Sequence, residues 1–383
     1  RNLEIIGEAA RRISEEVKQE HPEIPWRKII ALRNVLIHEY DDIDYKEIWQ
    51  VATFHLPRLI DQIRPLIPPL PPETSPPSFK NSRTPRTKEM DFQRFIGIDW
   101  SGARKPGRRI QVAECYPGNA APQIVPTGSG RNWRREEVRD WLVQLHNTGE
   151  KVLAGFDFAF AYPYCDKDAY FPGHDQSPTN AESLWKLVDS ICVNQNARDF
   201  YGGPFYNSPD AMFAQYLLYQ NYRGEHYEPR LRITDQSCPG NPSTVFKCVG
   251  PGSVGCGSVA GMRLLHDIKS KPSKSFLIWP FQPLDSSRSV IIEIYPRLFF
   301  RLAKYGSIDR GNRTHVNSVL THFDSDHLSE TKTNYSEDEV DAIISAAAIR
   351  HLSNNLNTWK PRELTECARL FEGWIFGVGS MNR

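Results

Sequence analysis

A proline-rich stretch near the N-terminus limits what this chain can fold into. Residues 64–90 read RPLIPPLPPETSPPSFKNSRTPRTKEM, and the second half of this stretch is polar and basic. Because proline lacks a backbone N–H and disfavours the interior of helices and strands, such a run is typical of an extended linker. We therefore expect two modules in the 383 residues, a segment over 1–66 and a domain over 91–383, joined by a linker over 67–90.

The first module has apolar residues at helical spacing. Three such stripes are present, over residues 3–17, 26–37 and 48–63. A spacing of three to four residues places these side chains on one face of a helix. The pattern predicts a short all-α segment.

The larger module alternates between apolar strands and amphipathic helices. Strands are expected over 94–101, 108–116, 151–163 and 289–296, and helices over 135–149 and 336–352. This order predicts an α/β domain with a mixed sheet. Residues 161–285 are rich in Tyr, Pro and Gly and are expected to form an irregular insertion.

Cysteine content and hydropathy indicate the cellular setting. The seven cysteines are odd in number and include no C-x-x-C pair, which favours free thiols in a reducing, cytoplasmic compartment over a disulfide framework. No apolar run of about 18 residues is present, so no membrane span is expected. The net charge of +1 argues neither for nor against binding of nucleic acid.

The stretch RNVLIHEY, residues 33–40, carries the first candidate site. Histidine is the side chain best able to exchange protons near neutral pH, and arginine keeps its positive charge. His38 could take the proton of a ribose 2′-OH while Arg33 neutralises the phosphorane, which would cleave RNA without a metal. The alternative is a histidine on a solvated helix end.

The whole first module resembles a known family. The carrying segments are NLEIIGEAARRISEE, HPEIPWRKIIALRNVLIHEY and IWQVATFHLPRLIDQI. They are similar to HEPN-type toxins of the HepT kind, the domain-of-unknown-function family 86, which are encoded beside minimal nucleotidyltransferase antitoxins. The resemblance implies that Arg33 and His38 are catalytic without a cofactor and that a homodimer forms the site. It also implies that the partner nucleotidyltransferase adenylylates Tyr40 to silence the toxin.

Acidic residues within apolar segments form the second candidate site. Asp99, Asp157 and Glu293 follow apolar strand residues, and Asp338 and Asp341 lie one turn apart on the last predicted helix. Charged groups are seldom placed there unless they are paired or bind a cation. Several carboxylates from separate elements could hold Mg²⁺ for phosphodiester hydrolysis. As alternatives, Asp99 could cap the turn DWSG, and Asp338 could be a first-turn helix acid.

The larger module also resembles known proteins, through GIDWSGA, GFDFAFAYP, NPSTVFKCVGPGSVGCGSVAGM, WPFQ, EIYP and DEVDAIISAAAIR. These segments are similar to the domain-of-unknown-function family 429 and to the ribonuclease H-like superfamily. The resemblance implies a nuclease acting on RNA or another nucleic acid, with these acids as its Mg²⁺ ligands.

Two other functions are open for the larger module. GIDWSG is similar to the first phosphate loop of sugar kinases, which makes an ATP-binding domain the enzyme alternative. A non-catalytic recognition module tethered to the toxin segment is the other. GPGSVGCGSVAGM matches no standard nucleotide-binding motif and is expected to form a tight loop near the acids. The basic stretches RKPGRR (104–109) and RNWRR (131–135) could contact phosphates or form solvated loops.

Overall fold

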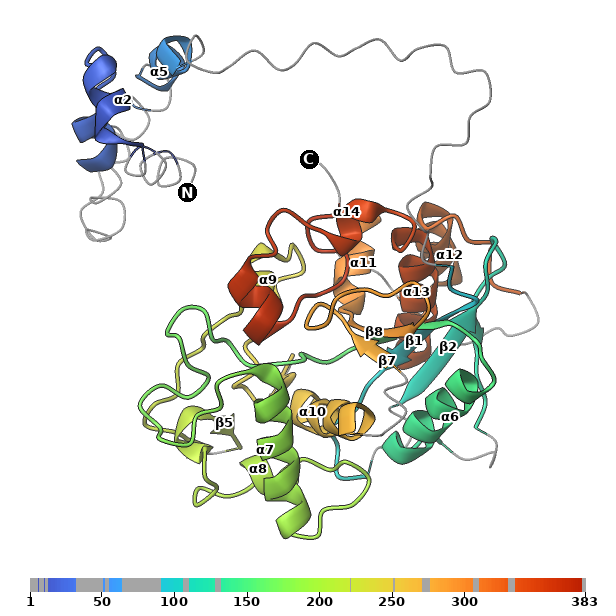
Figure 1. The fold of residues 1–383 in the computed structure, drawn as a ribbon. Coiled ribbons are helices and arrows are strands. Elements are labelled where there is room, and N and C mark those ends of the chain that lie inside the picture. The colour runs from blue at the N-terminus through green and yellow to red at the C-terminus, as the bar shows by residue number, and fades with distance from the viewer. Residues whose placement is uncertain are drawn as a thin grey trace, which may run out of the picture. The chain divides into compact units, whose positions relative to one another are not determined.

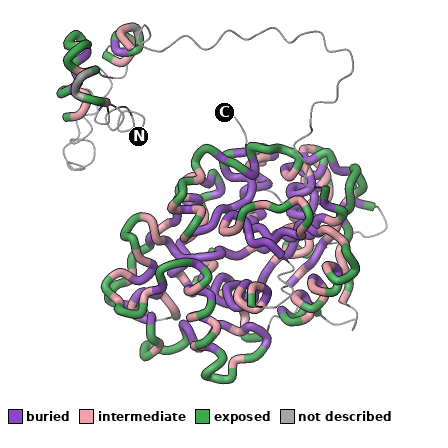
Figure 2. The backbone as a smooth tube through the Cα atoms, in the orientation of Figure 1, coloured by how far each residue is buried: buried purple, intermediate pink, exposed green. Residues whose placement is uncertain are grey.

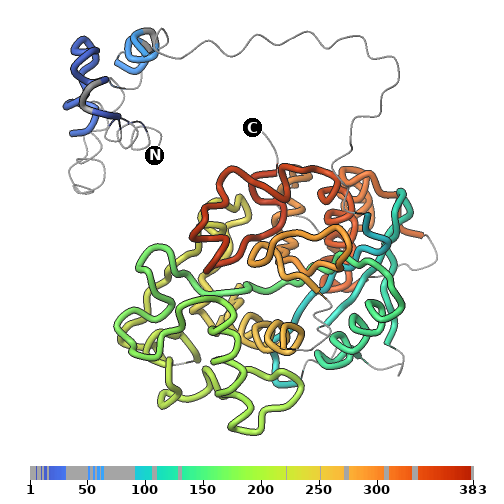
Figure 3. The backbone as a smooth tube through the Cα atoms, viewed as in Figure 1, coloured from blue at the N-terminus to red at the C-terminus, as the bar shows by residue number. Residues whose placement is uncertain are grey.

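The chain divides into two compact units, Arg1–Pro85 and Arg86–Arg383. The computed structural model describes residues 6, 10, 13–31, 51, 55–63, 91–105, 110–127, 132–220, 222–250, 252–270, 276–305, 310–329 and 335–380. Figure 3 follows the backbone of both units in chain order.

The smaller unit has a small helical core. Helix α2 (Glu15–Glu20) begins after Ser14, whose side chain accepts a hydrogen bond from the backbone N–H of Val17. Helix α5 spans Leu56–Ile63. Four buried residues from separate parts of the segment form the core: Ala10, Ile24, Trp26 and Leu59. Ile6, Ile13 and Ile29 pack against this core, in agreement with the predicted stripes at these positions, whereas Val17 is exposed.

A six-stranded mixed sheet forms the centre of the larger unit, as predicted. The strand order is β3-β2-β1-β4-β8-β7. The strands are β1 (Arg94–Asp99), β2 (Gln111–Cys115), β3 (Gln123–Ile124), β4 (Val152–Phe156), β7 (Phe276–Ile278) and β8 (Ser289–Glu293). Strands β1, β4, β8 and β7 run parallel, whereas β2 is antiparallel to both of its neighbours.

Helices cover both faces of this sheet (Figure 1). Helices α6 (Arg135–Asn147), α7 (Ala181–Asn194) and α10 (Gly255–Ser270) contribute to the core on one face. Helices α11 (Pro296–Leu302), α12 (Arg313–His322) and α13 (Glu337–Leu352) form the core on the other. Because side chains alternate along a strand, Phe95 joins the second core and Ile96 the first. The sheet is therefore buried between two helical layers, as the tube in Figure 2 shows.

Helix α13 lies unusually close to strand β1. A Cβ atom at Gly97 would lie 2.3 Å from the carbonyl oxygen of Ala342 and 2.7 Å from the backbone nitrogen of Ala346. Only glycine permits this approach of strand to helix. Ser336 caps the start of α13 by accepting a hydrogen bond from the Glu339 N–H.

The prediction of an irregular insertion over 161–285 is wrong. This region contains the long helices α7 and α10, the short helices α8 (Gly203–Tyr206) and α9 (Ile233–Ser237), and strands β5 (Leu218–Tyr219), β6 (Tyr222–Arg223) and β7. The segment GPGSVGCGSVAGM is also more than a tight loop, because α10 begins at Gly255 within it. The predicted strand over 151–163 ends earlier, at Phe156.

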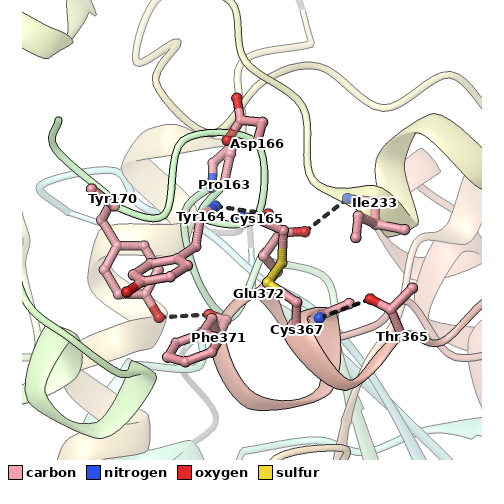
Figure 4. The surroundings of a disulfide bond; sticks show 12 residues. Pro163, Tyr164, Cys165, Asp166, Tyr170, Ile233, Thr365, Cys367, Phe371 and Glu372 are labelled. Carbon is pink, nitrogen blue, oxygen red and sulfur yellow. Dashed lines mark hydrogen bonds between the residues drawn. A yellow bond between two sulfur atoms is a disulfide. The ribbon is translucent and has the colours of Figure 1, made fainter.

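The expectation of free thiols holds for five cysteines but is wrong for two. Cys165 and Cys367 form a disulfide between positions 202 residues apart (Figure 4). Beside it, the buried Glu372 carboxylate accepts hydrogen bonds from the backbone N–H groups of Tyr164 at 2.7 Å and Cys165 at 2.8 Å. Glu372 also accepts one from Ile233 N–H at 2.8 Å. The disulfide and Glu372 thus join three segments that lie far apart in the chain.

Within the part of the chain that the structure describes, no helix combines the length and apolar character needed to cross a membrane.

Candidate functional site

Two of the predicted acids leave the sheet at the same edge. Asp99 is the last residue of β1, and Asp157 directly follows β4. These strands are parallel neighbours, with Ile98 opposite Phe156, and the Asp157 N–H donates to the Ile98 carbonyl at 3.0 Å. The carboxyl ends of parallel strands are where α/β sheets build their sites. The strand register therefore brings the two carboxylates together.

Helix α13 brings two further acids to this edge. Burial is the main cause that raises the pKa of Asp99 well above its ordinary value, and three carboxylates add to it: Asp157, Asp341 and Asp338. Burial also raises the pKa of Asp157, with contributions from Asp341 and Glu293, while Arg310 lowers it. Carboxylates that raise one another's pKa lie close enough in the fold to interact. The predicted acids thus form one electrostatic cluster.

A cavity of about 790 Å³ opens over three of these acids, Asp99, Asp157 and Asp338. The turn that follows β1 and the first turn of α10 pack against each other in its wall, where both Ser101 and Cys256 line it. Gly102 makes this possible, because a Cβ at that position would lie 2.2 Å from the carbonyl carbon of Cys256. The cavity therefore combines carboxylates with the first turn of a helix, the end of a helix that carries partial positive charge.

Asp99 and Asp157 are the acids best placed to act on a ligand. Both are half-buried and line the cavity. The predicted alternative, in which Asp99 caps the DWSG turn, has no support here, since Ser101 Oγ accepts the hydrogen bond from Ala103 N–H at 3.3 Å.

Glu293 is paired with an arginine, which is one of the two arrangements expected for an acid within an apolar strand. Its carboxylate accepts two hydrogen bonds from the Arg232 guanidinium, at 2.6 and 2.8 Å, and one from Phe160 N–H at 3.0 Å. Arg232 also binds Asp235, at 2.8 and 3.0 Å. The side chains of Arg232, Glu293 and Asp235 are only 1–2% exposed. Burial raises the pKa of Glu293, and Arg232 lowers it. Glu293 therefore belongs to a buried ion-pair network and does not line the cavity.

Asp341 is also held by an arginine. Its carboxylate accepts a hydrogen bond from Arg310 Nε at 2.6 Å. Burial raises the pKa of Asp341 to about 6, although Arg310 acts in the opposite direction. Asp341 thus contributes charge to the cluster while its own oxygen is bound by Arg310.

The donor set fits a divalent cation only in part. Among the described residues, no group of three or more His, Cys, Asp or Glu side chains is arranged to hold a metal ion. A Mg²⁺ ion, however, is usually bound by one or two carboxylates together with water and substrate phosphates. Asp99 and Asp157, which both line the cavity, match that smaller requirement in number, and Asp157 raises the pKa of Asp99.

Two residues of the cavity, Tyr295 and Arg297, were not predicted from the sequence, although they lie close to Glu293 in the chain. Tyr295 and Arg297 line the cavity, whereas Glu293 does not. The segment EIYP contains the signal, because a strand that ends at Glu293 places the residues after it at the sheet edge. Cys256 was missed because nothing in the sequence marks Gly255 as the first residue of a helix.

The structure does not describe the predicted site of the smaller unit. Arg33, His38 and Tyr40 lie outside the described residues.

Comparisons with known proteins concern the same segment. Residues 1–66 match the model of the family described as Ribonuclease HepT-like. A protein of Thermococcus cleftensis named "Probable ribonuclease HepT" is 44% identical over 59 residues, which cover 15% of this chain and 54% of that protein. A "Putative RNase" of Methanocaldococcus jannaschii is 40% identical over 63 residues, or 16% of this chain and 58% of that protein. A "Putative RNase" of Caldanaerobacter subterraneus is 37% identical over 67 residues, 18% of this chain and 60% of that protein.

This chain spans between about half and three-fifths of the length of these relatives. No solved structure matches. The N-terminal segment, residues 1–66, is thus similar to the HepT-like ribonucleases. This similarity confirms the predicted resemblance to HEPN-type toxins.

Proposed function

We propose that this protein is a nuclease with two separate active modules. The match of residues 1–66 to the HepT-like ribonuclease family carries the proposal, since that segment contains the R-x4-H motif of Arg33 and His38. In this module His38 removes the proton from a ribose 2′-OH, and the 2′-oxygen attacks the phosphorus. The bond from phosphorus to the 5′-oxygen breaks, and the leaving 5′-oxygen takes up a proton from water, while Arg33 stabilises the charge that develops on the phosphate. These steps need only side chains of the protein and water, so cleavage proceeds without a metal.

The resemblance extends this proposal to partners. A homodimer of the helical segment would bring two copies of the motif together, and a minimal nucleotidyltransferase would silence it by adenylylating Tyr40. On this basis we propose that the protein acts in a toxin–antitoxin system.

The test is a digest of two matched substrates by the full chain in excess EDTA. One is a single-stranded RNA, and the other is a DNA of the same sequence, which lacks the 2′-OH nucleophile. We expect cleavage of the RNA, with 2′,3′-cyclic phosphate ends, and no cleavage of the DNA. Cleavage of both substrates at similar rates would contradict the mechanism.

For the larger unit we propose Mg²⁺-dependent phosphodiester hydrolysis on a ribonuclease H-like fold. Asp99 and Asp157 would hold the ion, which would activate water and stabilise the leaving oxygen. The cluster of mutually repelling carboxylates supports this proposal, because a cation would relieve that repulsion. Arg297 and the first turn of α10 line the same cavity and are suited to bind the phosphate.

We predict that Mg²⁺ stabilises the parent protein and not the Asp99→Asn/Asp157→Asn variant. At ten times its dissociation constant the ion should add about 1.4 kcal/mol to the free energy of unfolding. Without metal, the variant should melt at a higher temperature than the parent at pH 7. Folding favours the protonated form of Asp99 and Asp157, because their pKa values are raised in the folded protein. The stability of the parent therefore falls as the pH rises through these raised pKa values. The neutral amides of the variant do not ionise and avoid this loss.

Differential scanning fluorimetry with and without Mg²⁺ provides the measurement. The variant Asp91→Asn/Asp175→Asn is the matched control, because both of its acids are exposed and lie outside the cavity. If Mg²⁺ raised the melting temperature of the parent and of the test variant equally, any bound ion would lie at a site other than Asp99 and Asp157. A rise in melting temperature with ATP, together with no Mg²⁺-dependent cleavage of nucleic acid, would favour the kinase-like alternative.

A further inference from the structure

A second cavity beside the carboxylate cluster is lined by cationic side chains. It measures about 1070 Å³, and four of its lining residues are Arg104, Lys105, Arg134 and Arg198. All four are exposed, and they come from three segments: the turn after β1, the residue before α6, and the loop after α7. We call this cavity the basic groove. The four cations therefore belong to three parts of the fold and not to one solvated loop.

The charges of this groove are available to a ligand. No described residue forms an ion pair with any of the four cations. The four cations outnumber the three acids of the lining, and one of these acids, Asp199, is paired with a buried arginine. Asp199 accepts hydrogen bonds from the buried Arg135 at 3.3 Å and from Glu136 N–H at 3.1 Å, and Glu137 accepts one from Arg134 N–H at 2.9 Å. Asp210 is the remaining acid of the lining. The groove therefore presents an excess of positive charge.

The basic groove adjoins the carboxylate cavity, since Arg104 and Tyr201 line both. A chain molecule bound along the groove can therefore extend to Asp99 and Asp157 without leaving the protein surface. An anionic polymer fits this arrangement better than a small ligand, because the cations occupy one cavity and the candidate catalytic acids the next.

Tyr201 offers an aromatic face where the two cavities meet. Its ring lies over Gly203, since a Cβ at that glycine would be 2.3 Å from Tyr201 Cε1. The Tyr201 hydroxyl accepts a hydrogen bond from Asn207 Nδ2 at 2.9 Å, which fixes the ring. Proteins that bind single strands combine a cationic groove with aromatic rings on which unpaired bases stack. A base inside a duplex is already stacked and cannot use this ring.

We propose that the basic groove binds a single-stranded polynucleotide and leads it past Tyr201 to the carboxylate cluster. The inference rests on the proposed hydrolase function of the larger unit and names its substrate as single-stranded nucleic acid. The phosphates contact Lys105, Arg134 and Arg198, and a base stacks on Tyr201.

The experiment measures binding by fluorescence anisotropy with the full chain in EDTA. The probes are 12-nucleotide oligodeoxythymidine, 2′-O-methyl oligouridine and a 12-base-pair DNA duplex, none of which has a reactive 2′-OH. The test variant is Lys105→Glu/Arg134→Glu/Arg198→Glu. The matched control is Lys304→Glu/Lys360→Glu/Arg362→Glu, which reverses three exposed charges outside the groove. Both variants carry the same N-terminal segment, so that segment cannot cause a difference between them.

We expect the test variant to bind both single strands at least tenfold more weakly than the control. The slope of log K against log salt should also fall by about 2, since each lost phosphate contact on a single strand removes about 0.7. Tyr201→Phe should keep the affinity, and Tyr201→Ala should lower it roughly tenfold. Equal binding by test and control variants, or tighter binding of the duplex by the parent, would overturn the inference.

This readout separates the inference from the proposed hydrolase. Loss of binding in the test variant, with no Mg²⁺-dependent cleavage by any form, would support the groove and contradict the hydrolase. Cleavage that depends on Asp99 and Asp157 but not on the groove cations would support the hydrolase and contradict the groove.

Discussion

RNA cleavage in EDTA is expected to fall at least 100-fold when His38 is replaced by alanine. A positioned general base contributes typically 10²- to 10⁴-fold to such a reaction, and no other group of the R-x4-H motif can accept a proton near pH 7. Arg33→Ala should have an effect of similar size, because an arginine that faces the phosphorane stabilises charge present only in the transition state. Initial rates on a fluorescent RNA under single-turnover conditions provide the measurement.

His55→Ala is the matched control for this experiment. His55 lies in the same unit, is exposed and is not part of the motif. Its replacement should leave the rate unchanged, and circular dichroism should show equal helix content in all three variants. Cleavage by His38→Ala at the parent rate would remove the ribonuclease assignment of the smaller unit.

Replacing Arg232 with methionine is expected to lower the free energy of unfolding by about 3–5 kcal/mol, the usual cost of removing one partner from a buried ion pair. Arg232 binds two buried carboxylates, those of Glu293 and Asp235. Without it, both charges would stay in a region that water does not reach. The guanidinium also donates to the carbonyl of Glu372 at 3.3 Å, so its loss weakens the segment beside the disulfide. Urea denaturation followed by tryptophan fluorescence measures the change.

Two further variants define the cause. Arg362→Met, at an exposed position, should change stability by less than about 0.5 kcal/mol. The triple variant Arg232→Met/Asp235→Asn/Glu293→Gln removes all three charges and should recover much of the loss. Equal stability of Arg232→Met and the parent would show that the network does not hold the fold.

The sequence allowed prediction of those parts of the fold that depend on local pattern. Strands β1, β2, β4 and β8 and helices α6 and α13 follow from apolar periodicity and capping residues. Helix α10 was not predicted because Gly255, Gly257 and Gly261 lower helix propensity. The structure supplies the reason for one of them: a Cβ at Gly261 would lie 2.3 Å from the ring of Phe158. Glycine is required at position 261 by tertiary packing, which cannot be read from the local sequence.

The same limit applies to the candidate site. Asp99 and Asp157 could be predicted because both follow apolar residues at the ends of strands. Glu293 has the same local pattern, but Arg232, its partner, is 61 positions away in the chain. A pattern of this kind identifies a buried acid without telling whether a cation or an arginine neutralises it. The pairing of Cys165 with Cys367 is likewise beyond the reach of cysteine spacing.

The direct backbone contact at Gly97 also fixes how the acids are placed. Asp99 is carried by the strand and Asp338 by the helix, so the approach of these two elements sets the distance between the carboxylates. Even alanine at position 97 would bring its Cβ to 2.3 Å from the Ala342 carbonyl oxygen, so the helix would have to move away from the strand. A residue without a side chain thereby holds two acids in place while touching neither of them.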